Sequence, residues 1–205
     1  MHPNPAFRQT HAQSSLDLVR ARGFGVLAVS TQTAPLMAHV PLLLSDTADH
    51  ILMHLVRSNP ICRAARTPVA ARIDVLGPDG YVSPDWYGVD DQVPTWNYVA
   101  VSFTGLLQPL PPETLPDVLA AQSAAYESRI ADKCPWTMEK MSDETRTRFL
   151  RMILPFRFQI DDMQSTWKLG QNKPDDVRTR AADHLTAGFG TDLAGLSDLM
   201  KDPPA

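Results

Sequence analysis

The chain has 205 residues, of which 43% are hydrophobic and 20% are charged, a composition typical of a globular protein with one substantial core. Its formal net charge of -4 gives no overall positive field that would attract nucleic acid or an anionic membrane surface. Composition therefore argues against a generally basic nucleic-acid-binding protein, and direct binding to DNA is expected to be weak.

The first part of the chain is predicted to form one helix followed by short strands. Proline occurs 18 times, nearly twice the usual share of about 5%, which favours short strands joined by turns over long helices. The first helix is expected to begin with Ser14 or Ser15 as its N-cap and to end at Gly23. Apolar runs separated by turn-like sequences then predict an antiparallel meander over residues 24–30, 36–44 and 51–56.

The remainder of the chain continues with longer strands and adds helices. Residues 69–76 predict another strand, residues 77–80 a turn, and residues 95–107 a long strand with alternating apolar side chains. After these come predicted helices at 113–128 and 143–152, the second capped by Ser142, a strand at 156–160 and a polar helix from Pro174. The expected organisation is a single domain over residues 1–188, with a helical insertion around 113–152 and a loosely held C-terminal tail over 189–205.

Signals for export or membrane insertion are not visible in the sequence. The N-terminal residues form no apolar segment of the signal-peptide type, and the longest apolar run, residues 36–44, is interrupted by His39 and Pro41. Cys62 and Cys134 form no Cys-x-x-Cys pair, which favours free thiols in a reducing compartment. We therefore expect a cytoplasmic protein without membrane contact.

Two motif interpretations fail on physical grounds, and a third feature, His39, keeps two interpretations. The sequence Gly23-Phe-Gly25-Val-Leu-Ala28 matches a nucleotide-binding fingerprint, but here it would leave a helix and open a strand, the reverse of what that loop requires. His50 and His54 would lie about 13 Å apart on a strand, so one metal ion could not bind both, and no metal is expected. His39, inside an apolar strand, is interpreted as a core histidine more readily than as a ligand contact.

The segment His54-Leu-Val-Arg-Ser-Asn-Pro60 is the first of four clusters that point to a ligand. It ends a strand and is predicted to begin a short helix, with Asn59 as N-cap and Pro60 at the first helical position. Free backbone N–H groups at that helix start, together with Arg57 and Ser58, could hold a phosphate. The alternative is an ordinary capped turn with a solvated arginine.

Two aromatic stretches and a polar loop complete the four clusters. The stretches 81–87 and 93–101 hold two tryptophans and three tyrosines among Ser83, Thr95 and Asn97, which favours a planar ligand, although a core rich in aromatic residues remains an alternative. The loop Trp167-Lys-Leu-Gly-Gln-Asn-Lys173 offers two lysines for an anion and two amides for the polar edge of a heterocycle. A solvated turn is the alternative for this loop.

The order of these motifs resembles the PaiB-type FMN-binding negative transcriptional regulators. The shared patterns are His-x-x-Arg-x-Asn-Pro, Tyr-Val-Ser-Pro-x-Trp-Tyr, Val-Pro-Thr-Trp-Asn-Tyr and Lys-Leu-x-Gln-Asn-Lys, between about Pro3 and Leu185. The resemblance implies a mainly β fold with flanking helices, an antiparallel, Greek-key-like, FMN-binding split barrel of the pyridoxamine-phosphate-oxidase type. It also implies a homodimer with FMN at the subunit interface. Gly170 departs from the family pattern, which has Ser there, and removes one hydroxyl from the loop.

With this resemblance, side-chain chemistry assigns a role to each cluster. The phosphate is assigned to Arg57, Ser58 and the Asn59 helix start with Lys168, the ring walls to Trp86, Trp96 and Tyr98, and the polar ring edge to Asn97 and Gln171. The full predicted FMN site comprises His54, Arg57, Ser58, Asn59, Ser83, Trp86, Thr95, Trp96, Asn97, Tyr98, Lys168, Gln171 and Asn172.

The expected function is that of a PaiB-like, FMN-binding transcriptional regulator, but two alternatives remain open at this point. One is a flavin-dependent oxidoreductase that acts on a small molecule with a small-molecule reductant. The other is a flavin-free regulatory or protein-interaction module. The sequence identifies no catalytic residue, so it does not decide whether the protein is an enzyme.

Overall fold

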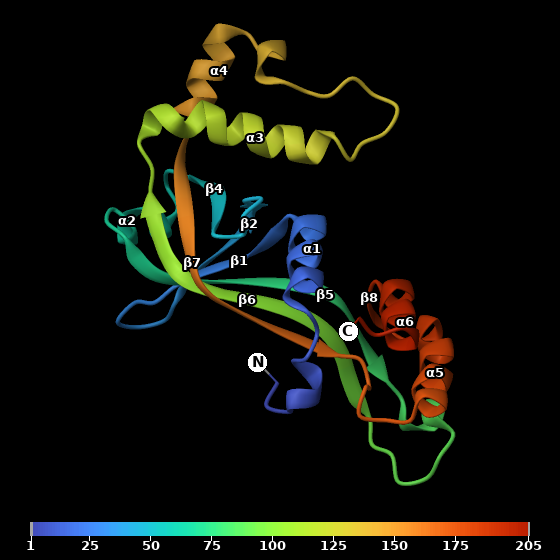
Figure 1. Cartoon of the computed structure of the whole chain (residues 1–205). Helices are drawn as coiled ribbons and strands as arrows, with labels where there is room; N and C mark the ends of the chain where they lie inside the picture. Colours follow the sequence, from blue (N-terminus) through green and yellow to red (C-terminus); the bar gives the residue numbers. More distant parts are fainter. Residues whose placement is uncertain (1, 205) are drawn as a thin grey trace. The chain divides into compact units, whose positions relative to one another are not determined.

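The structure, a computed structural model, describes residues 2–204 and is mainly β (Figure 1). Its strands are β1 (Phe24–Val29), β2 (Leu36–Pro41), β3 (Leu43–Leu44), β4 (His50–Val56), β5 (Val69–Val82), β6 (Thr95–Pro109), β7 (Ile153–Lys168) and β8 (Gly190–Thr191). They form one sheet in the order β2-β1-β5-β6-β7-β4-β3, and β8 pairs with β5. The pairs β1 with β2, β1 with β5, β3 with β4, β4 with β7 and β5 with β8 are antiparallel. This agrees with the predicted antiparallel fold, whereas β8 lies in the predicted tail, where no strand was expected.

Helices flank this sheet. The α-helices are α1 (Ala12–Arg22), α2 (Pro60–Ala64), α3 (Leu115–Glu127), α4 (Asp143–Leu150), α5 (Asp175–His184) and α6 (Leu193–Lys201). Short 3-10 turns are η1 (Pro5–Phe7), η2 (Pro84–Tyr87), η3 (Pro112–Thr114), η4 (Met138–Lys140) and η5 (Leu185–Ala187). Within residues 2–204, no helix is long and apolar enough to cross a membrane.

The described chain divides into two compact units. Unit 1 comprises residues 2–18, 75–102 and 164–204, and unit 2 comprises residues 19–74 and 103–163. The strands β5, β6 and β7 contribute residues to both. The single domain expected over residues 1–188 stays a prediction.

Unit 2 is built on strands with one buried face. In β4 the side chains of Ile51, Met53 and Leu55 are buried while the residues between them are partly exposed, the period of two expected for a strand that covers a core. Helix α3 packs against β3 and β4. The Tyr126 hydroxyl of α3 donates to the Leu42 carbonyl at 2.7 Å and to the Gly23 carbonyl at 3.1 Å, which fixes the helix on the sheet.

One glycine in unit 2 permits a close strand approach. A Cβ atom at Gly105 of β6 would lie 1.9 Å from the carbonyl oxygen of Gln159 in β7. No side chain fits there, because the backbone of β7 occupies the space. Gly105 thus lets β6 continue past β7 without a break, and the predicted strand over residues 95–107 is uninterrupted.

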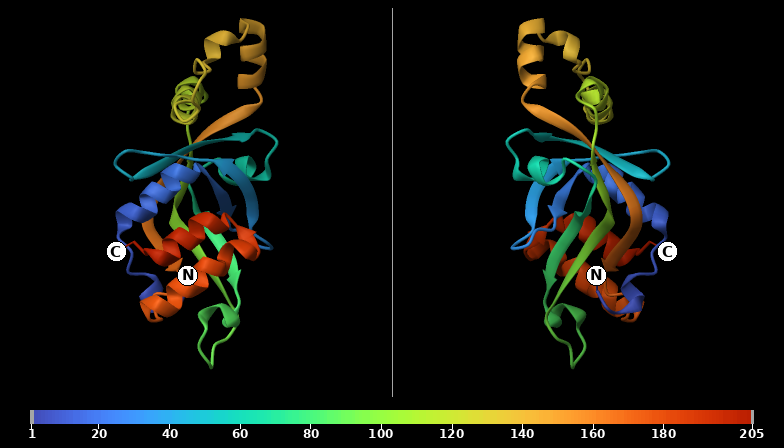
Figure 2. Two further views of the ribbon diagram at one scale, coloured as in Figure 1. Left: turned by 90° about the vertical axis from the view of Figure 1, so that its right-hand side faces the viewer. Right: turned by 90° about the vertical axis from the view of Figure 1, so that its left-hand side faces the viewer.

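Unit 1 has its own core, and helices α5 and α6 lie side by side in it, as both views of Figure 2 show. The buried residues of this core are Val82, Tyr87, Val99, Trp167, Leu169, Val177, Ala181, Ala182, Leu185, Leu196 and Met200. The sequence predicts a loosely held tail from residue 189, whereas the structure places Leu196 and Met200 of α6 at 0% exposure. Their spacing of four residues puts both on one face of a helix, and this spacing is typical of a helix that covers a core.

Three further positions differ from the sequence predictions. Residues 77–80 lie inside β5 and form no turn. A Cβ at Gly80 would lie 2.8 Å from Leu193, so glycine at this position leaves room for α6. Ser15 does not cap α1, which begins at Ala12, and its buried hydroxyl accepts a hydrogen bond from Trp167 Nε1 at 3.0 Å. His39 is exposed and stacks on Phe24, because β2 turns Ala38 and Val40 inward.

Candidate functional site

A cavity of about 700 Å³ lies in unit 2 where β4 ends and α2 begins. Its lining includes three residues of the predicted site, Arg57, Ser58 and Asn59, and also Arg63 and Arg66, which were not predicted. Among the described residues that line it, none is acidic. We call it the arginine cavity. Three guanidinium groups without a lining carboxylate favour an anionic ligand.

The start of α2 contributes less to this cavity than the sequence predicts. The Asn59 side-chain oxygen accepts from Ile61 N at 2.9 Å, and Cys62 N donates to the Asn59 carbonyl at 3.0 Å. Pro60 has no N–H, so the first backbone donors of this helix are absent or already paired. Asn59 and Pro60 are confirmed as N-cap and first helical residue, but the expectation of free N–H groups is wrong. Side chains must supply the anion contacts.

Arg57 is held in place from outside the helix. Its Nε donates to the Arg151 carbonyl at 2.9 Å, and its backbone N donates to the Met152 carbonyl at 2.8 Å. Next to it, burial raises the pKa of the Cys62 thiol, and the positive charge of Arg57 opposes that shift. The Cys62 thiol donates to the Val56 carbonyl at 3.4 Å. Arg57 is therefore fixed at the cavity wall, beside a thiol that stays protonated.

His54 is not among the residues that line the arginine cavity. Its Nδ1 lies 2.8 Å from Oε1 of Gln122, a buried residue of α3. The Gln122 Nε2 donates in turn to the carbonyls of Leu52 at 3.3 Å and Pro41 at 3.4 Å. This network links α3 to the sheet and accounts for His54 structurally. A contact of His54 with the cofactor stays a prediction.

A second cavity, of about 300 Å³, lies in unit 1. We call it the unit 1 cavity, and it brings together four of the predicted site residues, Thr95, Asn97, Lys168 and Asn172. Its other described lining residues are His2, Asn4, Phe7, Tyr87, Val93, Gly170 and Lys173. Four lining residues were therefore among the predicted site residues, whereas Tyr87 was not.

Two lysines dominate the polar chemistry of the unit 1 cavity. Lys168 Nζ donates to the Thr95 hydroxyl and to the Trp96 carbonyl, the latter at 2.7 Å. Lys173 Nζ donates to Gln92 Oε1 and lies 4.3 Å from the centroid of the Tyr87 ring. Burial, and secondarily the charge of Lys173, lower the pKa of Lys168. The two ammonium groups therefore repel each other.

The loop that carries these lysines is shaped by its own side chains. Gln171 accepts from Leu169 N at 2.9 Å and donates to the Trp167 carbonyl at 2.6 Å, so its amide closes the loop. Gln171 does not line the unit 1 cavity. Gly170 has a φ of +86°, a backbone conformation that serine rarely adopts, and its carbonyl accepts from Lys173 N at 3.0 Å. Glycine in place of the family's serine therefore suits this particular turn.

The predicted ring-wall residues fall into separate clusters within unit 1. Trp86 packs against the unit 1 core and stacks with His184 at a centroid distance of 6.3 Å. Trp96 is 40% exposed, and its Nε1 donates to Asp79 Oδ1 at 3.1 Å. Phe189 lies edge-on to Trp96 at 5.5 Å. Neither tryptophan lines the unit 1 cavity.

Ser83 and Tyr98 are the remaining predicted residues of the two aromatic stretches. Ser83 and Tyr98 are half-buried, and the Ser83 side chain makes no capping bond at the start of η2. Neither is among the residues that line the unit 1 cavity. The assignment of Ser83, Trp86, Trp96 and Tyr98 to the flavin therefore stays a prediction.

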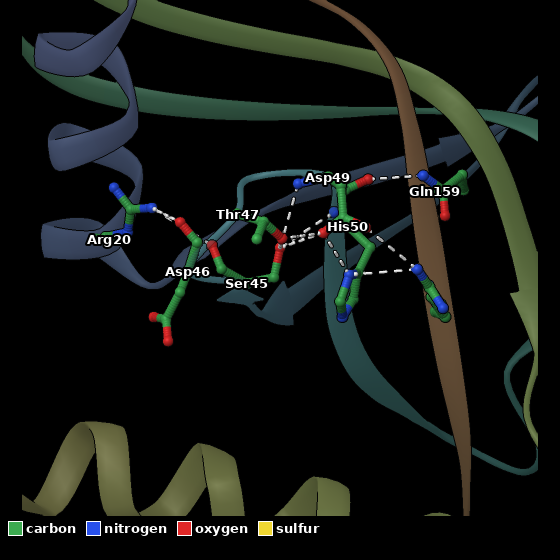
Figure 3. A network of polar contacts seen from close by, with 8 residues as sticks. Arg20, Ser45, Asp46, Thr47, Asp49, His50 and Gln159 are labelled. Atoms are coloured by element: carbon green, nitrogen blue, oxygen red, sulfur yellow. Dashed lines mark hydrogen bonds and ion pairs between the residues drawn. The ribbon is translucent and has the colours of Figure 1, made fainter.

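A serine, an aspartate and a histidine meet in unit 2, as Figure 3 shows, but not as a catalytic triad. The Ser45 hydroxyl donates to Asp49 Oδ1 at 2.8 Å, and His50 Nδ1 lies 2.8 Å from the same oxygen. A triad needs the serine hydroxyl on the histidine, whereas here both side chains bind the carboxylate. Hydrogen bonds from Thr47, Ser45 and His50 hold the pKa of Asp49 well below its ordinary value. The network fastens the turn between β3 and β4.

His50 and His54 have different partners, Asp49 and Gln122, so their spacing along the chain does not produce a joint site. Among residues 2–204, no three histidine, cysteine or acidic side chains are grouped so that they could hold a metal ion.

The chain is similar in sequence to a family of FMN-binding domains and to a curated relative. Residues 1–162 match the family model described as "Putative FMN-binding domain". A curated relative, "Protease synthase and sporulation protein PAI 2" of Bacillus subtilis (strain 168), is 27% identical over 198 residues, covering 96% of this chain and 94% of the relative. The family match and this relative confirm the predicted resemblance and FMN as the cofactor.

Solved structures support the fold. The FAD and heme binding protein from Mycobacterium smegmatis has a TM-score of 0.59 at 17% identity, over 90% of this chain and 82% of that one. The flavocytochrome Anf3 from Azotobacter vinelandii has a TM-score of 0.54 at 8% identity, over 93% of this chain and 80% of that one. At these identities the likeness concerns the fold alone, and the predicted split barrel is confirmed.

Proposed function

Because this chain belongs to the family of FMN-binding domains, we propose that it is a PaiB-like regulator that holds the FMN phosphate in its arginine cavity. The observation that carries the proposal is the set of three arginines around one cavity of about 700 Å³, with no acidic side chain among the described lining residues. The Bacillus subtilis relative, named for protease synthesis and sporulation, supports a regulatory role.

The residues present fit a phosphate dianion. Guanidinium groups donate paired, charge-assisted hydrogen bonds to phosphate oxygens. Arg57, Arg63 and Arg66 can bind the charge, and the Ser58 hydroxyl can add a neutral bond. Leu36 and Leu154 give the cavity an apolar wall. When bound, FMN supplies electron-transfer chemistry, and these side chains orient it through its phosphate.

The direct test is the visible absorption spectrum of freshly purified protein, followed by chemical identification of the released chromophore. We expect a flavin spectrum, or its appearance after addition of FMN. Protein that arrives colourless and takes up no FMN on titration would overturn the proposal.

Lys168 tests the predicted cofactor role of the unit 1 residues separately. We expect Lys168→Ala to weaken FMN binding by roughly 1.5–3 kcal/mol, the usual scale for a hydrogen bond to a charged group. The melting temperature of the free protein should fall slightly, because Lys168 also bonds the Thr95 hydroxyl and the Trp96 carbonyl. Calorimetric titration measures the affinity. The control is Lys201→Ala, which removes an exposed ion pair with Asp183; FMN affinity equal in both variants would remove Lys168 from the site.

A homodimer with flavin at the subunit interface is part of the proposal. Large apolar side chains remain exposed in unit 1, including Val93, Trp96 and Phe189, and in unit 2, including Phe24 and Met37. Such side chains are typical of surfaces that a partner covers. Light scattering at micromolar concentration is expected to give twice the chain mass of 22.7 kDa. A mass equal to one chain would contradict this prediction.

We further infer a cytoplasmic protein, which the free thiols of Cys62 and Cys134 support. Regulation through weak or indirect contact with DNA fits the net charge of -4 better than tight, non-specific binding.

A further inference from the structure

The Tyr87 hydroxyl has no hydrogen-bond partner although its side chain is 1% exposed. Within residues 2–204, only one other fully buried side-chain polar atom shares this state, Arg157 Nε in unit 2. Native proteins pair nearly all such atoms, and an exception calls for an explanation. Burial raises the pKa of Tyr87, so the phenol stays protonated and can donate. Tyr87 also lines the unit 1 cavity, where a ligand could supply the missing acceptor.

The same cavity holds positive charge without a lining counter-charge. Lys168 bonds a hydroxyl and a carbonyl, and Lys173 bonds the Gln92 amide and faces the Tyr87 ring, so the named partners are all neutral. None of the described residues that line the cavity is acidic. A negatively charged group would offset the mutual repulsion of the two ammonium groups.

A third donor has a weak partner that a ligand could replace. Asn97 is 1% exposed, and its Nδ2 donates to the Met200 sulfur at 3.4 Å. A thioether is a poor acceptor, so an oxygen atom would be a better one. Asn97 lines the unit 1 cavity together with Tyr87 and Lys168.

From these observations we propose that the unit 1 cavity binds a negatively charged oxygen group, with Tyr87 as its neutral donor and Lys168 and Lys173 as its counter-charges. The oxygen can be a ring carbonyl oxygen of FMN, which carries a partial negative charge, or it can belong to a free small carboxylate. Only the first case rests on the proposed function. Tyr87 is in either case a further binding residue of this chain.

The test compares wild-type protein with Tyr87→Phe by calorimetric titration, once with FMN and once with succinate as the small carboxylate. Because the lost hydroxyl has no partner in the free protein, the melting temperature without ligand should stay the same or rise. Affinity for the ligand that occupies the cavity should fall about tenfold, the scale of one buried hydrogen bond. A fall for FMN identifies the flavin, and a fall for succinate alone identifies a separate carboxylate site.

Tyr126→Phe is the matched control, because it removes a phenol that donates to two carbonyl oxygens in unit 2. It should lower the melting temperature and leave both affinities unchanged. The proposal is overturned if Tyr87→Phe binds both compounds as the wild type does. It is also overturned if Tyr87→Phe lowers the melting temperature as Tyr126→Phe does. Failure of wild-type protein to bind FMN would refute the arginine-cavity proposal while the succinate titration still decides this one.

Discussion

Replacing Arg63 and Arg66 together with alanine is expected to weaken FMN binding by about a hundredfold or more, since each lost charge-assisted bond costs about 1.5–3 kcal/mol. Both side chains line the arginine cavity and both residues are exposed, so the free protein should keep nearly its wild-type stability. Riboflavin has no phosphate, and its affinity should not change. Calorimetric titration of the wild type and the variant with both compounds measures the difference.

The control for this double variant is Arg22→Ala, which removes an exposed arginine at the end of α1 that does not line the cavity. It should bind FMN as the wild type does, which would show that loss of one positive charge outside the cavity does not weaken binding. Equal affinity of the wild type for FMN and riboflavin would contradict a phosphate site of any kind. A double variant with unchanged FMN affinity would show that the phosphate is held elsewhere.

The part of this cavity that could be predicted from sequence is local. Asn59 and Pro60 act on backbone within two residues, so their roles as cap and first helical residue follow from residue type. Arg63 and Arg66 were missed because an arginine in or just after a short helix is usually solvated. Arg63 lies in α2 and Arg66 follows its end, and the recurrence of arginine at positions 57, 63 and 66 was the available signal.

Roles that depend on distant partners could not be predicted in the same way. Gln171 has the chemistry of a ring-edge contact, yet its amide closes its own loop. Tyr87 belongs to an aromatic stretch that the sequence highlighted, but its unpaired hydroxyl becomes evident only once the surrounding core is in place. The sequence of residues 77–80 resembles a turn because it contains Gly80. In the structure Gly80 belongs to a strand and leaves room for Leu193, which is more than a hundred residues away in sequence. Tertiary contacts overrode local preference at each of these positions.

Helix α6 is the clearest such case, and it leads to a prediction about stability. Leu196 is fully buried among the core residues of unit 1, so Leu196→Ala should lower the free energy of unfolding by about 2–5 kcal/mol, the cost of a cavity in a packed core. A loosely held tail would show almost no change. Urea denaturation of the purified protein measures the free energy, with the slope of the transition as a check on two-state behaviour.

Leu76→Ala is the control for this measurement, because it makes the same substitution in unit 1 at a side chain that is 58% exposed. Its effect should stay within about 0.5 kcal/mol. A Leu196 variant no less stable than the Leu76 variant would show that α6 does not contribute to the core. The helix also supplies Met200, whose sulfur accepts from Asn97 and whose carbonyl accepts from Arg178 Nε at 2.7 Å. Loss of α6 packing should therefore disturb Asn97 at the unit 1 cavity, whereas the arginine cavity has no lining residue in this helix.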